Sequence, residues 1–149
     1  MRVAAIQMDL AWEDPAANTE RAAARLAEAA AAGAELAVLP EMFATGFSMR
    51  AAEHAEPPGG PIQAFLGERA AAHGMAVLTT VAIADGGRRY NTAVVFGSDG
   101  VLRARNPKLH PFRYAREHEH FAPGDAPATG PLGDHVLGTA VCYDLRFPE

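Results

Sequence analysis

The sequence predicts an α/β domain in which helices pack on a sheet. Three observations predict it: strand-like and helix-like segments alternate over the first half, three strand-like runs joined by glycine turns follow, and 149 residues suit one domain with a real core. Nearly half of the residues are apolar, but alanine dominates that share and adds helix propensity more than core volume. The prediction therefore rests on the order of the elements.

The N-terminal segments predict a short strand followed by a long helix. Arg2–Met8 is typical of a short buried strand. Asp14 can cap a helix, and Pro15 occupies the one helical position at which proline costs nothing. We expect this alanine-rich helix to run to Ala32, with Gly33 as its C-cap.

The rest of the chain predicts a second helix and five further strands. Glycine turns at 85–87 and 98–100 lie between strand-like runs and indicate hairpins. The expected elements are a helix over Ile62–His73 and strands over Leu36–Leu39, Met75–Ile83, Tyr90–Phe96 and Val101–Arg105. After an irregular stretch from 106 to 134, a last strand over Val136–Val141 should run directly into Cys142.

Composition and charge exclude several classes of function. The formal net charge is −5 and no Lys/Arg cluster is dense enough to follow a phosphate backbone, so no nucleic-acid partner is expected. No apolar run is long enough to span a membrane, and the N-terminus turns acidic too soon for a signal peptide, so we expect a cytoplasmic protein. The single cysteine excludes an internal disulfide and a thiolate zinc site, and a lone cysteine is ordinarily a small buried apolar residue.

Three reactive side chains each follow the end of a predicted strand. Glu41 comes after LAVL and a proline, Lys108 follows the strand that begins at Val101, and Cys142 stands at the tip of the last strand. If these strands share one sheet and end on the same side, an acid, an amine and a thiol converge there. Spacing in the sequence leaves that convergence open.

The motifs around these residues resemble a known family. PEMF, NPKLHPF and VCYDLRFPE, in this order, are similar to the three catalytic motifs of the nitrilase (carbon–nitrogen hydrolase) superfamily, and VAAIQMDLAWEDPAANTERA resembles its first strand and helix. EMFATGFSM and FRYAREHEHFAPGD look most like the bacterial omega-amidase branch, which acts on omega-amides of 2-oxo acids such as 2-oxoglutaramate. The resemblance implies an α-β-β-α sandwich, of which residues 1–149 would be the N-terminal part, roughly three-fifths of a single domain. Because relatives continue further, we expect uncovered sheet edges and apolar faces here.

The resemblance also implies catalytic roles. Cys142 would attack the amide carbonyl and form a thioester, with Glu41 as the general base that takes the thiol proton and later activates water. Lys108 would stabilise the tetrahedral oxyanion together with the backbone N–H of Tyr143. The family places a second glutamate after the lysine, which would orient that lysine and the attacking water. Glu117 matches it, although a neighbour competes for the assignment and either could be an ordinary charged loop residue. The competing neighbour is Glu119.

Other residues are candidates for binding the substrate. Arg146 could aim into the pocket and bind the carboxylate of a 2-oxo acid, or it could form an ion pair with Asp144. Aromatic residues that could either wall the pocket or pack in the core are Phe43, Phe47, Phe112 and Tyr114. His110, His118 and His120 lie close together, but without a helical register they are weak evidence for a metal site, so we expect them to shape the substrate loop and expect no cofactor.

The sequence thus predicts a thiol amidase that takes a small-molecule amide, with two alternatives. The same machinery would serve a nitrile, a carbamoylated amine or another aliphatic amide. The alternative outside the enzymes is a non-catalytic chain that pairs with another subunit. Analogy with the family also suggests a homodimer.

Overall fold

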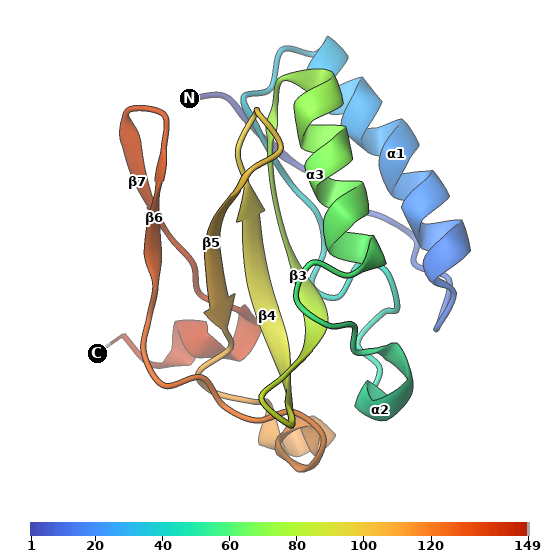
Figure 1. Cartoon of the computed structure of the whole chain (residues 1–149), viewed down its shortest axis with the longest axis vertical. Helices are drawn as coiled ribbons and strands as arrows, with labels where there is room; N and C mark the ends of the chain where they lie inside the picture. The colour runs from blue at the N-terminus through green and yellow to red at the C-terminus, as the bar shows by residue number, and fades with distance from the viewer. Residues whose placement is uncertain (149) are drawn as a thin grey trace.

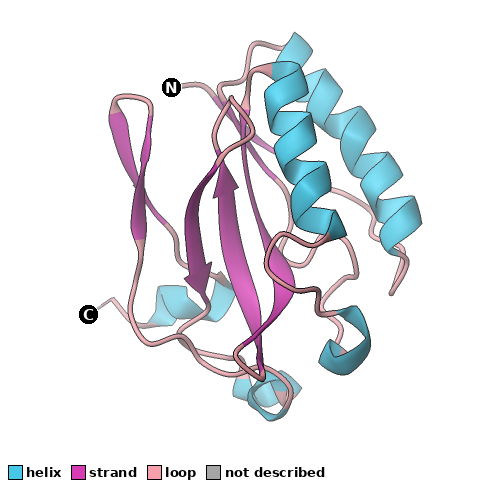
Figure 2. Cartoon of the chain, viewed as in Figure 1, coloured by secondary structure: helices cyan, strands magenta, loops and turns pink. Residues whose placement is uncertain are grey.

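The computed structural model describes residues 1–148, so the final glutamate of VCYDLRFPE lies outside the described residues. The helices are α1 (Pro15–Ala31), α2 (Ala51–His54) and α3 (Pro61–His73). The strands are β1 (Val3–Ala5), β2 (Leu36–Val38), β3 (Ala76–Asp85), β4 (Arg88–Phe96), β5 (Leu102–Pro107), β6 (Thr129–Leu132) and β7 (His135–Gly138). Single 3₁₀ turns cover Arg113–Ala115, Glu117–Glu119 and Cys142–Arg146. This arrangement confirms the predicted α/β class (Figure 2).

The main sheet has five strands in the order β1-β2-β3-β4-β5. The first three run parallel and the last three antiparallel. In the ladder, Ala82 pairs with Asn91 across β3 and β4, and Thr92 pairs with Pro107 across β4 and β5. Strand β2 ends at Val38, in the row of Ala104, so β5 continues three residues past the end of β2, in the direction in which the chain runs on to residue 41.

Both long helices cover one face of this sheet (Figure 1). The first begins where predicted, because Asp14 Oδ1 accepts a hydrogen bond from Ala17 N at 3.0 Å and proline follows at the first helical position. The second ends at Gly74, whose φ of 58° is the left-handed conformation of a helix C-cap. Apolar side chains of both helices are buried against those of β3 and β4 and form the main core, as Leu26 and Leu66 do.

The opposite face of the sheet carries only a thin cover. The β6–β7 hairpin forms a separate two-stranded sheet (Figure 2). Leu132 of this hairpin is buried in a small cluster with residues of β2, β3 and β4, while Val38, Leu78 and Ala104 around it are half-buried. The expectation of an incompletely covered apolar face is met on this side.

The predicted last strand is wrong in extent. Strand β7 ends at Gly138, well before Cys142, and pairs with β6 rather than with the main sheet. Gly133, with φ 57°, permits the tight turn that folds this segment back on the residues just before it. The cysteine therefore begins a 3₁₀ turn instead of standing at a strand tip.

Smaller differences lie at the N-terminal half. The first strand is limited to Val3–Ala5, because only these residues pair with β2, and the short helix Ala51–His54 was not predicted. Within residues 1–148, no helix has the length and apolar character needed to cross a membrane.

Candidate active site

Glu41 follows β2 in a segment that β3 fixes through side-chain hydroxyls. Thr79 Oγ1 donates to Pro40 O at 2.8 Å, and Met42 N donates to Thr80 Oγ1 at 2.8 Å. The Glu41 side chain remains 23% exposed. Two backbone anchors on either side of one residue thus fix its direction while its carboxylate stays accessible.

Lys108 follows β5 and is buried among acidic groups. Its backbone continues the ladder, because Lys108 N donates to Asn91 O at 2.8 Å. Its Nζ lies 2.9 Å from Glu41 Oε1 and 2.9 Å from Glu117 Oε2, and its side chain is 1% exposed. Phe47 faces the same ammonium, with its ring centroid 5.2 Å from Nζ.

The charges in this cluster hold the lysine in its protonated form. Burial alone would lower the pKa of Lys108, but the carboxylates of Glu41 and Glu117 outweigh it, and the pKa is raised above its ordinary value. The cluster of one ammonium and two carboxylates therefore carries a net negative charge at neutral pH.

The structure selects Glu117, not Glu119, as the second carboxylate. Arg116 adopts a left-handed conformation with φ 59°, which turns the following 3₁₀ segment so that Glu117 points inward and is fully buried. Its Oε2 also accepts from Phe112 N at 2.5 Å. Glu119 is exposed and pairs with Arg116 at 2.9 Å.

Asn91 belongs to the cluster, although the sequence interpretation did not single it out. Its side chain is almost fully buried, and Nδ2 donates to Glu41 Oε1 at 2.7 Å and to Glu117 Oε1 at 3.0 Å. The available signal was an asparagine inside the otherwise apolar run YNTAVVF, a residue type that strands disfavour.

Cys142 opens a 3₁₀ turn next to this cluster. It is exposed and has φ 50°, and together with Glu41 it lines a cavity of about 280 Å³ over the end of β2 and the interior of β3. Among the described residues only four other than glycine have positive φ, and three are at the site: Cys142 itself, Met42 after Glu41, and Arg116 before the buried glutamate. Such strain gathers at functional sites.

The electrostatics of Cys142 keep the thiol protonated in the free protein. Burial first, and then the negative charge of Glu41, raise the pKa of the thiol, while Lys108 opposes them. A nucleophilic thiolate at this position would need a base that removes its proton. The negative charge of Glu41 already acts on this thiol, and both residues line the same cavity, so Glu41 stands where such a base is required.

Asp144 connects the cysteine turn to the lysine loop. The carboxylate is buried and accepts from Val141 N at 3.0 Å, from His110 N at 2.8 Å, and faces His110 Nδ1 at 3.0 Å. The histidine ring in turn stacks on Phe147 at 3.8 Å between centroids. One side chain therefore fixes the segment before the thiol against the segment after the lysine.

The three clustered histidines have different surroundings: His110 and His118 line one pocket, which His120 does not join. His110 belongs to the Asp144 contact, whereas His118 and His120 are exposed. Across residues 1–148, no group of three or more histidine, cysteine or acidic side chains is placed to hold a metal ion.

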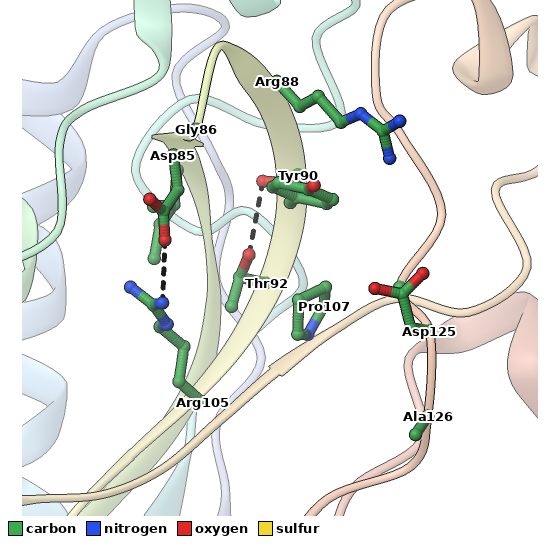
Figure 3. Close-up of a pocket in the computed structure, with 11 residues that line it drawn as sticks. Asp85, Gly86, Arg88, Tyr90, Thr92, Arg105, Pro107, Asp125 and Ala126 are labelled. Atoms are coloured by element: carbon green, nitrogen blue, oxygen red, sulfur yellow. Dashed lines mark hydrogen bonds and ion pairs between the residues drawn. The ribbon is translucent and has the colours of Figure 1, made fainter.

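A cavity of about 510 Å³, larger than the one at Cys142, lies away from the thiol (Figure 3). Tyr90 and Thr92 line it, and because they alternate with Asn91 along β4, it opens on the other face of the sheet. Arg105 and Asp85 form an ion pair in its wall at 2.8 Å. The volume of a cavity therefore does not identify the candidate active site. The convergence of reactive side chains identifies it.

Comparison with known proteins identifies the family. A family model described as carbon-nitrogen hydrolase matches residues 2–149. The chain belongs to the carbon-nitrogen hydrolase family. A nitrilase from Pyrococcus abyssi is 34% identical over 100% of this chain and 58% of its own length, and an omega-amidase from Homo sapiens is 32% identical over 99% of this chain and 56% of its own. The chain thus spans a little over half the length of these relatives.

Solved structures of carbon-nitrogen hydrolases share the fold. A superfamily member from Xanthomonas campestris, with an arsenic adduct in its active site, superposes with a TM-score of 0.91 at 34% identity, over 99% of this chain and 55% of its own. An amidase from Nesterenkonia sp. AN1 superposes with a TM-score of 0.88 at 26% identity, over 99% and 59%. The active-site cysteine of that amidase carries a Michael adduct of acrylamide. The predicted resemblance is confirmed.

The expected substrate contacts of this hydrolase chain are distributed over different places. Phe112 and Tyr143 pack edge to face, with centroids 5.1 Å apart, beside the cysteine turn. Arg146 is exposed and does not line the cavity at the cysteine. Of the aromatic alternatives, Phe43 is a core residue stacked on Phe65 at 6.3 Å, and Tyr114 is 87% exposed.

Proposed function

We propose that this chain supplies the machinery of a thiol amidase that hydrolyses small omega-amides of 2-oxo acids to the acid and ammonia. The observation that supports it most is the buried ammonium of Lys108 between two carboxylates, because one of them, that of Glu41, lines the same cavity as Cys142. The substrate class is taken from the omega-amidases that the chain resembles at 32–34% identity.

In the first half of the proposed reaction, the thiol adds to the amide. Glu41 removes the thiol proton as Cys142 Sγ bonds to the carbonyl carbon, and the carbonyl oxygen becomes an oxyanion. Lys108 Nζ and the backbone N–H of Tyr143 stabilise that charge. The tetrahedral adduct then collapses: the C–N bond breaks and the nitrogen takes the proton from Glu41. Ammonia departs, and the acyl group remains bound to Cys142 as a thioester.

In the second half, water replaces the leaving ammonia. Glu41 takes a proton from water as its oxygen attacks the thioester, and the same donors stabilise the second oxyanion. The C–S bond breaks, Cys142 recovers its proton, and the carboxylic acid is released. Glu117 keeps Lys108 protonated and in place throughout, because its buried carboxylate raises the pKa of that lysine.

Recognition of a 2-oxo acid requires a cation for its carboxylate. We assign this role to Arg146, whose guanidinium can bind a carboxylate through two parallel hydrogen bonds. Because this side chain is exposed in the free chain, the proposal requires that it turn toward the cavity when substrate binds. Phe47, Phe112 and Tyr143 would supply the apolar wall.

The test is ammonia release from 2-oxoglutaramate by the wild-type chain and by Cys142→Ala. We expect release from the wild type alone, and equal release from both would contradict the thiol mechanism. A nitrile substrate is the second candidate, because a nitrilase matches the chain as well as the omega-amidases do. A panel of omega-amides, nitriles and carbamoylated amines ranks the two, and activity confined to nitriles would reverse the order.

A chain without turnover is the remaining alternative, and thiol labelling distinguishes it. If the cluster activates Cys142, iodoacetamide should alkylate the native thiol at a rate that depends on Glu41. A rate equal to that of the urea-unfolded chain, and unchanged by Glu41→Gln, would favour a non-catalytic role.

A further inference from the structure

We infer that Asn91 is a positioning residue, whose side-chain amide holds the carboxylates of Glu41 and Glu117 on either side of Lys108. This inference rests on the proposed function, since it gives the asparagine its role in preparing the base. Asn91 does not touch the cavity at Cys142 and would act on the reaction only through its neighbours.

One residue contacts every charged member of the cluster. Asn91 Nδ2 uses one hydrogen for Glu41 Oε1 at 2.7 Å and the other for Glu117 Oε1 at 3.0 Å. Its backbone carbonyl accepts from Lys108 N at 2.8 Å. The ammonium closes the ring from the other side, at 2.9 Å from both carboxylates. Two like charges are thereby separated by donors on both sides.

The contacts divide the two oxygens of Glu41 between separate tasks. Within the described part of the chain, both Asn91 and Lys108 donate to Oε1. Oε2 accepts no hydrogen bond from the described residues, so it remains available to take a proton, as a general base requires. Fixing one oxygen with two donors orients the other without blocking it.

The chemistry favours a neutral donor at this position. A cation there would add positive charge and weaken the carboxylate of Glu41 as a base, and an apolar residue would leave both carboxylates short of a hydrogen bond. Asparagine donates twice without charge. Its own Oδ1 is buried without a partner among the described residues, so the hydrogen bonds of this side chain are those to the two carboxylates.

Asn18 provides a matched control. It is also fully buried, and its Nδ2 also donates twice, to Ala11 O at 2.7 Å and Ala44 O at 2.8 Å. These acceptors are backbone carbonyls, so Asn18→Ala should lower stability without touching the charged cluster.

The experiment compares Asn91→Ala and Asn18→Ala in kcat, KM and the pH profile of ammonia release. For Asn91→Ala we expect kcat to fall about 100-fold with KM within about 2-fold, because the base is misplaced rather than the substrate. The acidic limb of its profile should move to higher pH, since the charged carboxylates lose a donor. Asn18→Ala should keep the wild-type profile. Asn91→Ser, which keeps one donor, should lie between wild type and Asn91→Ala and serves if the latter does not fold.

Several outcomes decide the inference. A folded Asn91→Ala or Asn91→Ser chain with wild-type kcat and profile overturns it. If the wild-type chain releases no ammonia from any amide, the proposed function fails, and the pH dependence of Cys142 alkylation by iodoacetamide then decides the positioning role. If the pH dependence of alkylation is altered in the Asn91 variants but not in Asn18→Ala, the positioning role is supported. If it is unaltered in the Asn91 variants, the positioning role is overturned.

Discussion

Glu117→Gln is the substitution that most directly tests the buried cluster. It keeps the shape of the side chain and removes one of the two carboxylates that hold Lys108. At 2.9 Å, the attraction between this carboxylate and Nζ is about 6 kcal/mol for an effective dielectric constant of about 20. Removing the charge also removes a desolvation penalty of several kcal/mol, so these two contributions roughly cancel.

The hydrogen-bond pattern determines what remains. Glu117 accepts on both oxygens: Oε2 takes Lys108 and Phe112 N, and Oε1 takes Asn91 Nδ2. A glutamine has one acceptor oxygen, which would keep the two donors at Oε2. Its NH₂ group would then face the NH₂ group of Asn91, and two buried donors without an acceptor cost about 1–3 kcal/mol.

Urea unfolding at pH 7 measures this loss, with Glu119→Gln as the control. Glu119 is exposed and its pair with Arg116 is on the surface, so its substitution should change stability by less than about 0.5 kcal/mol. In ammonia release we expect kcat to fall about 10- to 100-fold for Glu117→Gln and not for Glu119→Gln. Equal effects of the two substitutions, on stability and on kcat, would refute the reasoning.

The sign of the pH dependence follows from Lys108. Because its pKa is raised in the folded chain, the stability it contributes is present at neutral pH and is lost as pH rises through that elevated pKa. Glu117→Gln removes one of the causes of the rise, so in the variant the stability that Lys108 contributes should be smaller and its loss should be complete at a lower pH. The difference in stability between wild type and variant should therefore narrow above about pH 10.5, the ordinary value for lysine.

Two further predictions concern the cysteine turn. Glu41→Gln should move the pH midpoint of Cys142 alkylation by iodoacetamide downward, because the charge of Glu41 is one cause of the raised pKa of the thiol. The rate of ammonia release should fall more than about 100-fold in the same variant. An alkylation midpoint that stays or rises would contradict this prediction. Asp144→Asn leaves one acceptor oxygen for donors that now use two. We therefore expect the free energy of unfolding to fall by about 1–3 kcal/mol and the Tm in a thermal scan to fall by roughly 2–10 °C. We also expect kcat to be reduced about 10-fold. An unchanged Tm and kcat would show that the turn does not depend on this carboxylate.

The sequence was informative where reactive residues follow predicted strands. Glu41 follows the apolar strand β2, and Lys108 follows the mostly exposed strand β5, which a glycine turn joins to β4, so their convergence could be expected once one sheet was assumed. The choice between Glu117 and Glu119 could not, because it depends on the left-handed conformation of Arg116. The sequence EHE does not indicate which of the two carboxylates turns inward.

The last strand and Asn91 show two other limits. An apolar run such as VLGTAV does not indicate its pairing partner, and β6 was hidden by Pro131, a residue that strands accept mainly at edges. A polar residue inside a strand, such as Asn91, is visible in the sequence. Its role was overlooked because the carboxylates that accept its hydrogen bonds lie 50 and 26 residues away along the chain. Such long-range polar contacts require coordinates.

The left-handed backbone at Met42, Arg116 and Cys142 has a consequence for heat inactivation. Each such residue costs about 1–3 kcal/mol and is held only by its surroundings, whereas the helix-covered core has no comparable burden. These turns are therefore the segments that gain most by relaxing, and they should do so below the temperature at which the sheet unfolds. Function and fold would then have separate thermal limits, and a chain that still gives a native circular dichroism spectrum could already have lost its reactive cysteine geometry.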